Sequence, residues 1–205
     1  MSKLFIRIIN KLKRILCSLN KIFYGNFGYN SYIVLPSYIT QRKNISIGNN
    51  VFIRNNARIE PVTQWYNNSY KPKVIIEDNV SIEQNIQLTC SNFVKIGKNT
   101  MVNSYVFITD IDHDYSEINE PIKKQKLIVS ETIIGEDCFI GTGVKIMAGV
   151  KLGNHCVVGA NAVVTHSFPD YCVIAGVPAK VIKKYDFEKS EWVKITKLLY
   201  SGGGE

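Results

Sequence analysis

The chain has 205 residues, of which 45% are hydrophobic and 20% charged, a composition typical of a globular domain with a sizeable core. No apolar run is long enough to cross a bilayer. The first residues interleave basic and apolar side chains and lack the apolar stretch of a secretory signal. These features argue against a membrane-spanning or secreted protein and favour a cytoplasmic one.

The positive charge is concentrated at the N-terminal end. The formal net charge is +8, yet residues 1–59 hold ten Lys or Arg and no Asp or Glu. Residues 2–23 are predicted to form an amphipathic helix with a wide apolar stripe beside these charges. Such a helix either lies on the anionic inner face of the membrane or packs on the body of the protein or a neighbouring subunit. We therefore expect residues 1–24 to form a separate basic segment, and we expect no nucleic-acid partner.

Beyond residue 44 the chain repeats with a period of six. A branched apolar residue is followed four positions later by a small or modest one, as in Ile140 and Val144. A helix needs a period of 3.6 and a half-buried strand a period of 2, so neither fits alone. Six residues suit one short strand followed by a tight corner. Three such sides close one triangular coil of a parallel β-helix. The branched positions are Ile47, Ile53, Ile59, Ile76, Ile82, Leu88, Ile96, Val102, Ile108, Ile134, Ile140, Ile146, Leu152, Val158 and Val164.

Two interruptions divide the repeat. Pro61 ends the first hexads, and residues 61–73 are predicted to form an extruded loop. The second interruption runs from Thr109 to about Ser130, and loops of that length in a compact repeat are often functional. The turns between strands are rich in Asn and Gly, which tolerate left-handed backbone conformations.

The chain is expected to leave the repeat at its C-terminal end. Residues 166–185 depart from the hexad pattern, so we place the solenoid domain at residues 25–184. Residues 185–205 are predicted to hold a short helix, around residues 190–200, and a flexible end. The five cysteines match no zinc signature. Cys138 and Cys156 are eighteen apart, and we expect them to be stacked core thiols in a reducing compartment.

Three features together resemble one enzyme family. The hexads, the loop ITDIDHDY at residues 108–115 and the exit segment IAGVPAKVIKK at residues 174–184 resemble the left-handed β-helix acyltransferases, and within them the galactoside/maltose and polysaccharide-biosynthesis sugar O-acetyltransferases. The resemblance covers about residues 45–184. It implies an all-β solenoid of left-handed coils, against the usual right-handed crossover. It also implies acetyl-CoA as donor, a sugar or glycan acceptor, and a homotrimer with active sites between subunits.

His113 is the candidate catalytic base. O-acetyl transfer needs a group that removes the acceptor hydroxyl proton as the oxygen attacks the thioester, and imidazole suits this near neutral pH. The matching family histidine has this role. Asp110 and Asp112 are candidates to orient its ring, and Asp112 is also a candidate acceptor contact. The alternative is a solvated loop histidine, which its place between a coil and a long loop disfavours.

Asn85 is the second candidate catalytic residue, and it also counts as an acceptor contact. It lies on the coil before that of His113 and matches a family asparagine near the acetyl group and acceptor. The spacing before it departs from the family by two residues, and a plain turn asparagine is the alternative. In the first loop, Trp65, Tyr66 and Tyr70 are candidates to stack on a pyranose ring. That loop alternatively covers the coil edge or meets a neighbour.

The resemblance also implies donor contacts along the C-terminal coils. Lys180 and Lys183 match family positions that meet the nucleotide phosphates, and opposite charges give a physical reason for this contact. The alternative for both lysines is a solvated charged face. His166 stands where the family often has Lys. The matching positions are Thr142, Ala160, Thr165, His166, Lys180 and Lys183.

Three other functions are alternatives. A γ-type carbonic anhydrase would bind zinc through three histidines, but His155 and His166 occupy different hexad phases, so no metal is expected. N-acetylation of a nucleotide-linked amino sugar needs the same base and donor and stays open. A non-catalytic scaffold would not need the His113 loop. The sequence therefore predicts an acetyl-CoA-dependent O-acetyltransferase of a sugar hydroxyl in surface polysaccharide or lipopolysaccharide biosynthesis.

Overall fold

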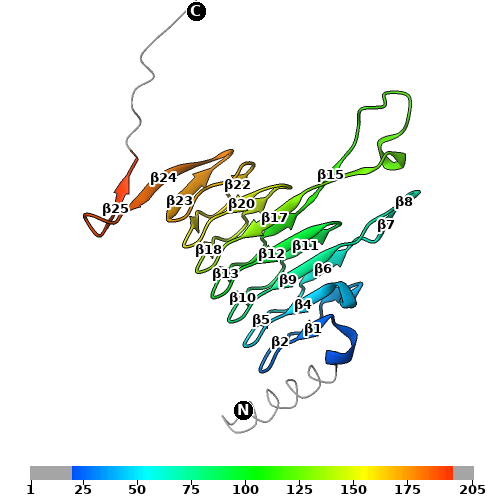
Figure 1. Ribbon diagram of the computed structural model, residues 1–205, viewed down its shortest axis with the longest axis horizontal. Helices are drawn as coiled ribbons and strands as arrows, with labels where there is room; N and C mark the ends of the chain where they lie inside the picture. Colours follow the sequence, from blue (N-terminus) through cyan, green and yellow to red (C-terminus); the bar gives the residue numbers. More distant parts are fainter. Residues whose placement is uncertain (1–19, 196–205) are drawn as a thin grey trace, which may run out of the picture.

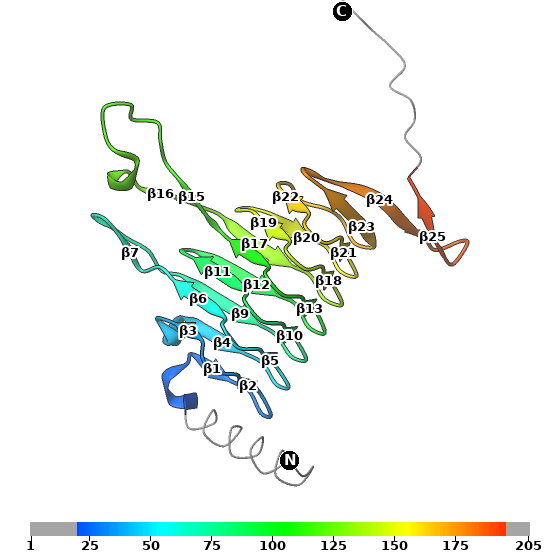
Figure 2. The ribbon, with the colours of Figure 1, turned by 180° about the vertical axis from the view of Figure 1, so that it is seen from behind.

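The computed structural model describes residues 20–195, which form a three-sided stack of coils. Each coil contributes one strand to each of three sheets, named A, B and C, and neighbouring coils pair in parallel (Figures 1 and 2). Sheet A contains β1 (Asn26–Phe27), β4 (Ile45–Ile47), β9 (Lys73–Ile76), β12 (Phe93–Ile96), β17 (Glu131–Ile134) and β20 (Lys151–Leu152). The fold is the predicted left-handed parallel β-helix.

The other two sheets complete each coil. Sheet B contains β2 (Tyr32–Ile33), β5 (Phe52–Ile53), β10 (Ser81–Ile82), β13 (Met101–Val102), β18 (Phe139–Ile140), β21 (Val157–Val158) and β23 (Cys172–Gly176), extended by β24 (Ala179–Asp186) and β25 (Glu191–Lys194). Sheet C contains β3 (Tyr38–Ile39), β6 (Arg58–Pro61), β11 (Gln87–Cys90), β14 (Phe107–Thr109), β19 (Lys145–Ile146) and β22 (Val163–Val164). Short 3-10 turns are η1 (Asn20–Phe23), η2 (Arg42–Asn44) and η3 (Ile122–Lys124).

The hexad residues fill the inside of the coils, as predicted. In sheet A the parallel register stacks Ile47, Ile76 and Ile96 directly on one another, and all three side chains are buried. Successive strand residues point to opposite faces, so the residue next to each core residue along its strand faces outward. Cys138 and Cys156 are buried free thiols in neighbouring coils, as the spacing predicted.

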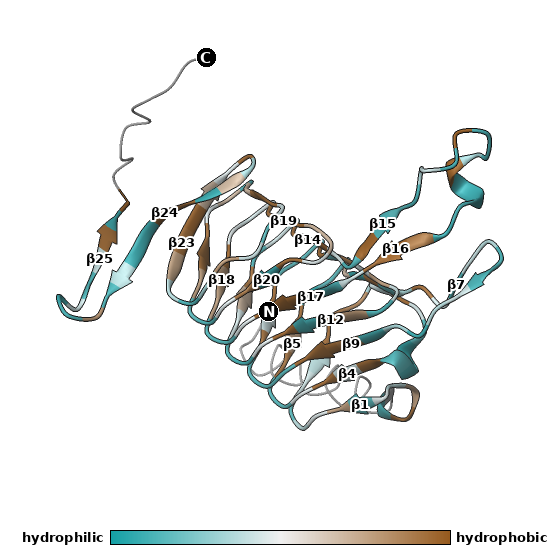
Figure 3. Cartoon of the chain, turned by 45° about the horizontal axis from the view of Figure 1, so that its top comes forward, coloured by the Kyte–Doolittle hydropathy of each residue, from teal (hydrophilic) through white to brown (hydrophobic). Residues whose placement is uncertain are grey.

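A ladder of amides holds the corner between sheets A and B. Asn50 donates through its side-chain amide to Asn79 (3.2 Å), and Asn79 donates to Asn99 (3.0 Å). All three have positive φ, a conformation that asparagine tolerates better than most residues. The polar turns of this corner are teal in Figure 3. The prediction that Asn-rich segments form left-handed turns is confirmed.

Both interruptions of the repeat are hairpins. The first carries β7 (Gln64–Trp65) and β8 (Asn68–Ser69), and the second carries β15 (Ile111–His113) and β16 (Leu127–Val129). They project from the same side of the stack in both views (Figures 1 and 2). The sequence predicted loops at these places but not their antiparallel pairing.

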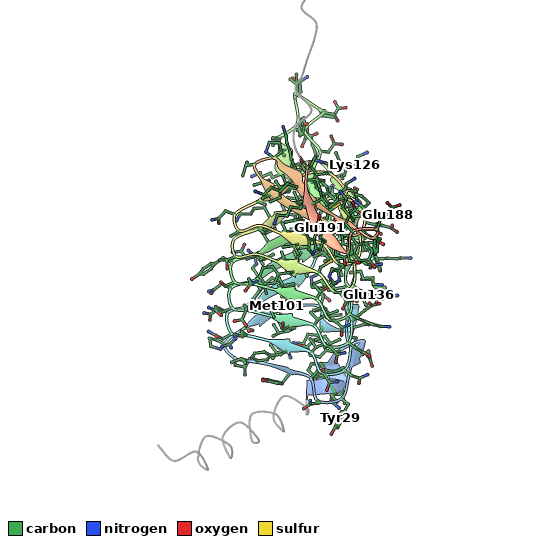
Figure 4. All side chains as sticks on the ribbon, turned by 90° about the vertical axis from the view of Figure 1, so that its left-hand side faces the viewer. Tyr29, Met101, Lys126, Glu136, Glu188 and Glu191 are labelled. Carbon is green, nitrogen blue, oxygen red and sulfur yellow. The ribbon has the colours of Figure 1, made fainter. Side chains whose placement is uncertain are left out.

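The C-terminal end differs from the prediction. Residues 172–176 still pair with sheet B through β21, and the chain then doubles back as β24 and β25. The predicted helix around residues 190–200 is wrong for Glu191–Lys194, which is strand β25. The open edge of β24 supplies hydrogen-bond partners, and Trp192 packs against Tyr185 with ring centroids 5.4 Å apart. Glu188 and Glu191 mark this hairpin in Figure 4.

The predicted N-terminal helix falls almost entirely outside the described residues. Its last residues form the 3-10 turn η1, and Tyr24 and Phe27 then enter the core. Within residues 20–195 no helix has the length and apolar character needed to cross a membrane.

Candidate active site

The outer face of sheet C has two edges of different construction. All six strands run in the same direction, so all begin at one edge and end at the other. We call the corner where they begin the turn edge, formed by Asn55–Asn56, Gln84–Asn85, Ser104–Tyr105, Thr142–Gly143 and Ala160–Asn161. We call the side where they end the hairpin edge, formed by residues 62–70, residues 110–130 and Thr165–His166. Every predicted site residue except Lys183 lies on or beside one of these edges.

His113 lies on the wall of a cavity at the hairpin edge. The cavity has a volume of about 370 Å³. Trp65 packs edge-on against the imidazole, with ring centroids 5.0 Å apart and planes at 62°. The cavity, named here the His113 cavity, is lined by Arg58, Glu60, Val62, Trp65, Thr89, Phe107, Thr109, Ile111, His113, Leu127 and Met147. The structure thus brings together two predicted residues, His113 and Trp65, that are far apart in the sequence.

A hydrogen bond joins the two hairpins next to His113. The amide of Leu127 donates to the Tyr70 hydroxyl at 2.8 Å, and Leu127 is the strand partner of His113. Tyr70 therefore holds the second hairpin against the first, a role that sequence reasoning did not foresee when it named Tyr70 as one candidate for sugar stacking. Tyr66 lies at the turn of the first hairpin with positive φ, half exposed and outside the cavity lining.

Asp110 anchors the hairpin edge and does not orient the imidazole. It is fully buried, and its carboxylate accepts hydrogen bonds from the amides of Ser91, Asn92 and Phe93 at 2.7–2.8 Å. The Cys90 thiol lies 3.2 Å from the same carboxylate, and burial together with this negative charge raises the thiol pKa. The cluster fixes the point from which β15 departs.

Asp112 contacts the backbone and not the ring of His113. Its carboxylate accepts a hydrogen bond from the His113 amide at 2.8 Å, and it lies outside the cavity lining. Within residues 20–195 the His113 ring nitrogens have no hydrogen bond, so the described part of one chain supplies no hydrogen-bond partner that orients the imidazole. The prediction that Asp110 or Asp112 binds this ring is not met in the single chain.

Asn85 lies at the opposite edge in a second cavity. This cavity has a volume of about 250 Å³ and is lined by Asn85, Gln87, Tyr105, Val106, Phe107 and Lys145. Asn85 occupies the second turn position with φ of 64°, as the plain turn interpretation also expects. The four residues of β11 separate it from the hairpin edge, a span of about 13 Å. Asn85 and His113 of one chain therefore line different cavities, with Phe107 between them.

The predicted donor residues divide between the same two edges. Thr142 and Ala160 take the first turn positions at the turn edge, where the Asn161 amide donates to the Thr142 carbonyl at 2.8 Å. Thr165 and His166 follow β22 at the hairpin edge, both exposed, with the Thr165 hydroxyl 3.4 Å from His166 Nδ1. One chain does not bring these two pairs together.

A bulge places both predicted lysines on one face. In the antiparallel pair of β23 and β24, Val173 lies opposite Lys183 and Ala175 lies opposite Lys180, with a register shift between them. Directly paired residues share a face of the sheet. Lys180 and Lys183 are three residues apart and would face opposite sides of a regular strand, but the bulge adds one residue to β24 and turns both to the same face. Lys180 lies beside the turn edge, because its partner Ala175 packs near Gly159. Lys183 lies opposite Lys194 of β25.

Comparison with known proteins identifies the family. The model of the bacterial transferase hexapeptide (six repeats) matches residues 131–166. The chain is 32% identical over 197 residues to the protein of Escherichia coli K12 named "Putative lipopolysaccharide biosynthesis O-acetyl transferase WbbJ", with 93% of each chain covered. The chain belongs to the hexapeptide-repeat acetyltransferases. The family predicted from the hexads, the His113 loop and the exit segment is therefore confirmed.

Two solved structures of hexapeptide-repeat enzymes have the same fold. Galactoside acetyltransferase in complex with coenzyme A is 26% identical, covers 87% of this chain and 76% of its own, and superposes with a TM-score of 0.55. A point mutant of AntD, an N-acyltransferase from Bacillus cereus in complex with dTDP and coenzyme A, is 24% identical, covers 82% and 88%, and superposes with a TM-score of 0.67. Within residues 20–195 no group of three or more His, Cys, Asp or Glu is placed to hold a metal ion.

Proposed function

We propose that this hexapeptide-repeat acetyltransferase transfers acetyl from acetyl-CoA to a sugar hydroxyl, with His113 as the general base. The observation that carries the proposal is the placement of His113 on the wall of a cavity that also holds Trp65. An imidazole beside an aromatic ring combines a base with a surface suited to a pyranose. The named function of the WbbJ relative supports a role in surface polysaccharide or lipopolysaccharide assembly.

The proton and the acetyl group move in opposite directions. His113 takes the proton of the acceptor hydroxyl as its oxygen attacks the thioester carbonyl carbon. The carbon–sulfur bond breaks, and the departing CoA sulfur takes the proton from the imidazolium. His113 ends the reaction neutral, and the products are the acetyl ester and free CoA.

The active site lies between neighbouring protomers of a homotrimer in this proposal. His113, Thr165 and His166 occupy the hairpin edge, whereas Asn85, Thr142, Ala160 and Lys180 occupy or border the turn edge. A three-fold rotation places one surface of a protomer against a different surface of the next. The hairpin edge of one protomer then faces the turn edge of its neighbour, which supplies Asn85 to the base and completes the donor site.

The basic N-terminal segment suggests where the enzyme works. Its six Lys and Arg among residues 1–24 favour a peripheral position at the anionic inner face of the membrane, close to a lipid-linked acceptor. Deleting residues 1–23 should release the cytoplasmic enzyme from liposomes containing anionic lipid. Unchanged liposome binding would contradict this placement.

The proposed chemistry is tested by acetyl-CoA turnover over a panel of glycosides and nucleotide-linked amino sugars. His113→Ala should lower acceptor-dependent CoA release by about 10²- to 10⁴-fold, the usual contribution of a general base. His155→Asn is the matched control, because His155 lies at the corner between sheets A and B with φ of 56°, which asparagine tolerates. Equal turnover of His113→Ala and the native chain would remove His113 from the mechanism. Turnover of only the amino sugars would establish N-acetylation.

A further inference from the structure

The floor of the His113 cavity carries an arginine–carboxylate pair. Arg58 and Glu60 lie two residues apart on β6 and therefore point to the same outer face. Arg58 Nε donates to Glu60 Oε2 at 2.9 Å, and Nη2 contacts the same oxygen. Within residues 20–195 the second oxygen, Oε1, accepts no hydrogen bond, and the Glu60 side chain is 26% exposed. Glu60 therefore offers one oriented, unoccupied acceptor to a molecule in the cavity.

The pairing leaves the cavity lining without an unpaired lysine or arginine. Among its lining residues Arg58 is the one Lys or Arg, and Glu60 already neutralises it. An anionic group that enters would lie beside the Glu60 carboxylate, and this contact between like charges disfavours it. Uncharged hydroxyl groups face no such penalty.

The rest of the floor suits hydroxyl groups. The parallel register places Thr89 beside Glu60 and Thr109 beside Thr89. The Thr89 hydroxyl donates to the Thr109 hydroxyl at 2.8 Å, which leaves its oxygen able to accept from a ligand. Together with Trp65 on the wall, the cavity offers an aromatic face, a carboxylate oxygen and a hydroxyl oxygen within one small space.

We infer that Glu60 is a specificity-determining residue that accepts hydrogen bonds from sugar hydroxyls, so that the acceptor unit in the His113 cavity is an uncharged sugar ring. Arg58 holds the carboxylate in place, and the carboxylate selects against acidic sugars. This inference rests on the proposed function, because it assumes that the cavity beside His113 receives the acceptor. Any phosphate of a lipid-linked or nucleotide-linked acceptor stays outside the cavity.

The experiment measures glycoside binding separately from acetyl transfer. The full-length chain saturated with CoA is titrated with methyl glycosides of glucose, galactose and mannose and with the three matching uronates, and dissociation constants are obtained by NMR. Glu60→Gln keeps the shape of the side chain and removes its charge. Glu77→Gln is the matched control, because Glu77 is a half-buried carboxylate that follows β9 and pairs with Lys95 of sheet A at 2.8 Å, away from the cavity.

The native chain should bind at least one neutral glycoside at least about 10-fold more tightly than its uronate, as expected for hydrogen bonds to a charged group. Glu60→Gln should lose about 10-fold in affinity for the neutral glycoside, and Glu77→Gln should match the native chain. Equal or tighter uronate binding, unchanged binding by Glu60→Gln, or no binding of any glycoside by the native chain would overturn the inference. Binding through Glu60 without acetyl transfer would instead contradict the proposed function alone.

Discussion

The two edges of sheet C are built from the same strands but by different means. At the turn edge the backbone repeats from coil to coil, with amides of Tyr105, Gly143 and Asn161 donating to the preceding turn at 2.8–3.2 Å. At the hairpin edge the chain leaves the coil twice, for residues 62–70 and 110–130. These excursions are held by side-chain contacts, mainly those of Asp110 and Tyr70.

The difference separates a repetitive surface from a variable one. The turn edge gains stability from repetition, so its residues are positioned by the period of the coil. The hairpin edge can change in length and sequence without disturbing the stack, because loops outside the core tolerate variation. It carries His113, the proposed base, together with Trp65 and part of the lining of the His113 cavity. Of the three substitutions that follow, those at Asp110 and Tyr70 test the hairpin edge, and the one at Lys183 tests the donor site away from both edges.

Asp110→Asn should have the largest effect, because it disrupts the anchor of the hairpin edge. The amide group would face backbone N–H donors that need an acceptor, at a cost of about 2 kcal/mol or more in unfolding free energy. Thermal or urea unfolding measures the loss. Asp137→Asn is the control, because Asp137 is exposed and accepts from Asn99 at a regular corner. Equal stabilities of the two variants would mean that the hairpin edge needs no special anchor.

Lys183→Ala should affect donor binding and stability in opposite directions. Lys183 lies directly opposite Lys194, and like charges in such a pair are destabilising by about 0.2–1 kcal/mol. The variant should therefore unfold at the same or slightly higher temperature, while the KM for acetyl-CoA rises about 5- to 10-fold through the lost phosphate contact. Lys184→Ala, on the neighbouring residue, is the control. An unchanged KM in Lys183→Ala would indicate a solvated charged face.

Tyr70→Phe should have the smallest effect. It removes only the hydroxyl that accepts from Leu127, worth about 1 kcal/mol, and loosens the strand that carries His113. We expect a several-fold lower kcat with little change in the KM for acetyl-CoA. Tyr66→Phe alters the exposed tip of the same hairpin and should behave as the native chain. A kcat in Tyr70→Phe equal to that of Tyr66→Phe would show that the bond does not position the base.

The turn edge was far more predictable from the sequence than the hairpin edge. Hexads such as Ile134–Ile140–Ile146 report the coil directly, because one branched residue per side must fill its interior. The roles of Asp110 and Tyr70 depend on contacts between residues 17–57 positions apart, which no local pattern records. One feature of the sequence could have predicted the Arg58–Glu60 pair. Glu60 follows Arg58 by two residues on a hexad strand, so both side chains face outward. The strand at Glu191–Lys194 was missed because its partner is the distant edge of β24.

The central claim is that each active site combines the hairpin edge of one protomer with the turn edge of the next. The direct test mixes two inactive variants, His113→Ala and Asn85→Ala, after unfolding and refolding them together. Each retains the edge that the other lacks. If sites form between protomers, random assembly should restore about a quarter of the native sites, since each interface draws its two edges independently. If both residues act within one chain, no mixture contains an intact site, and activity no higher than that of the separate variants would contradict the account.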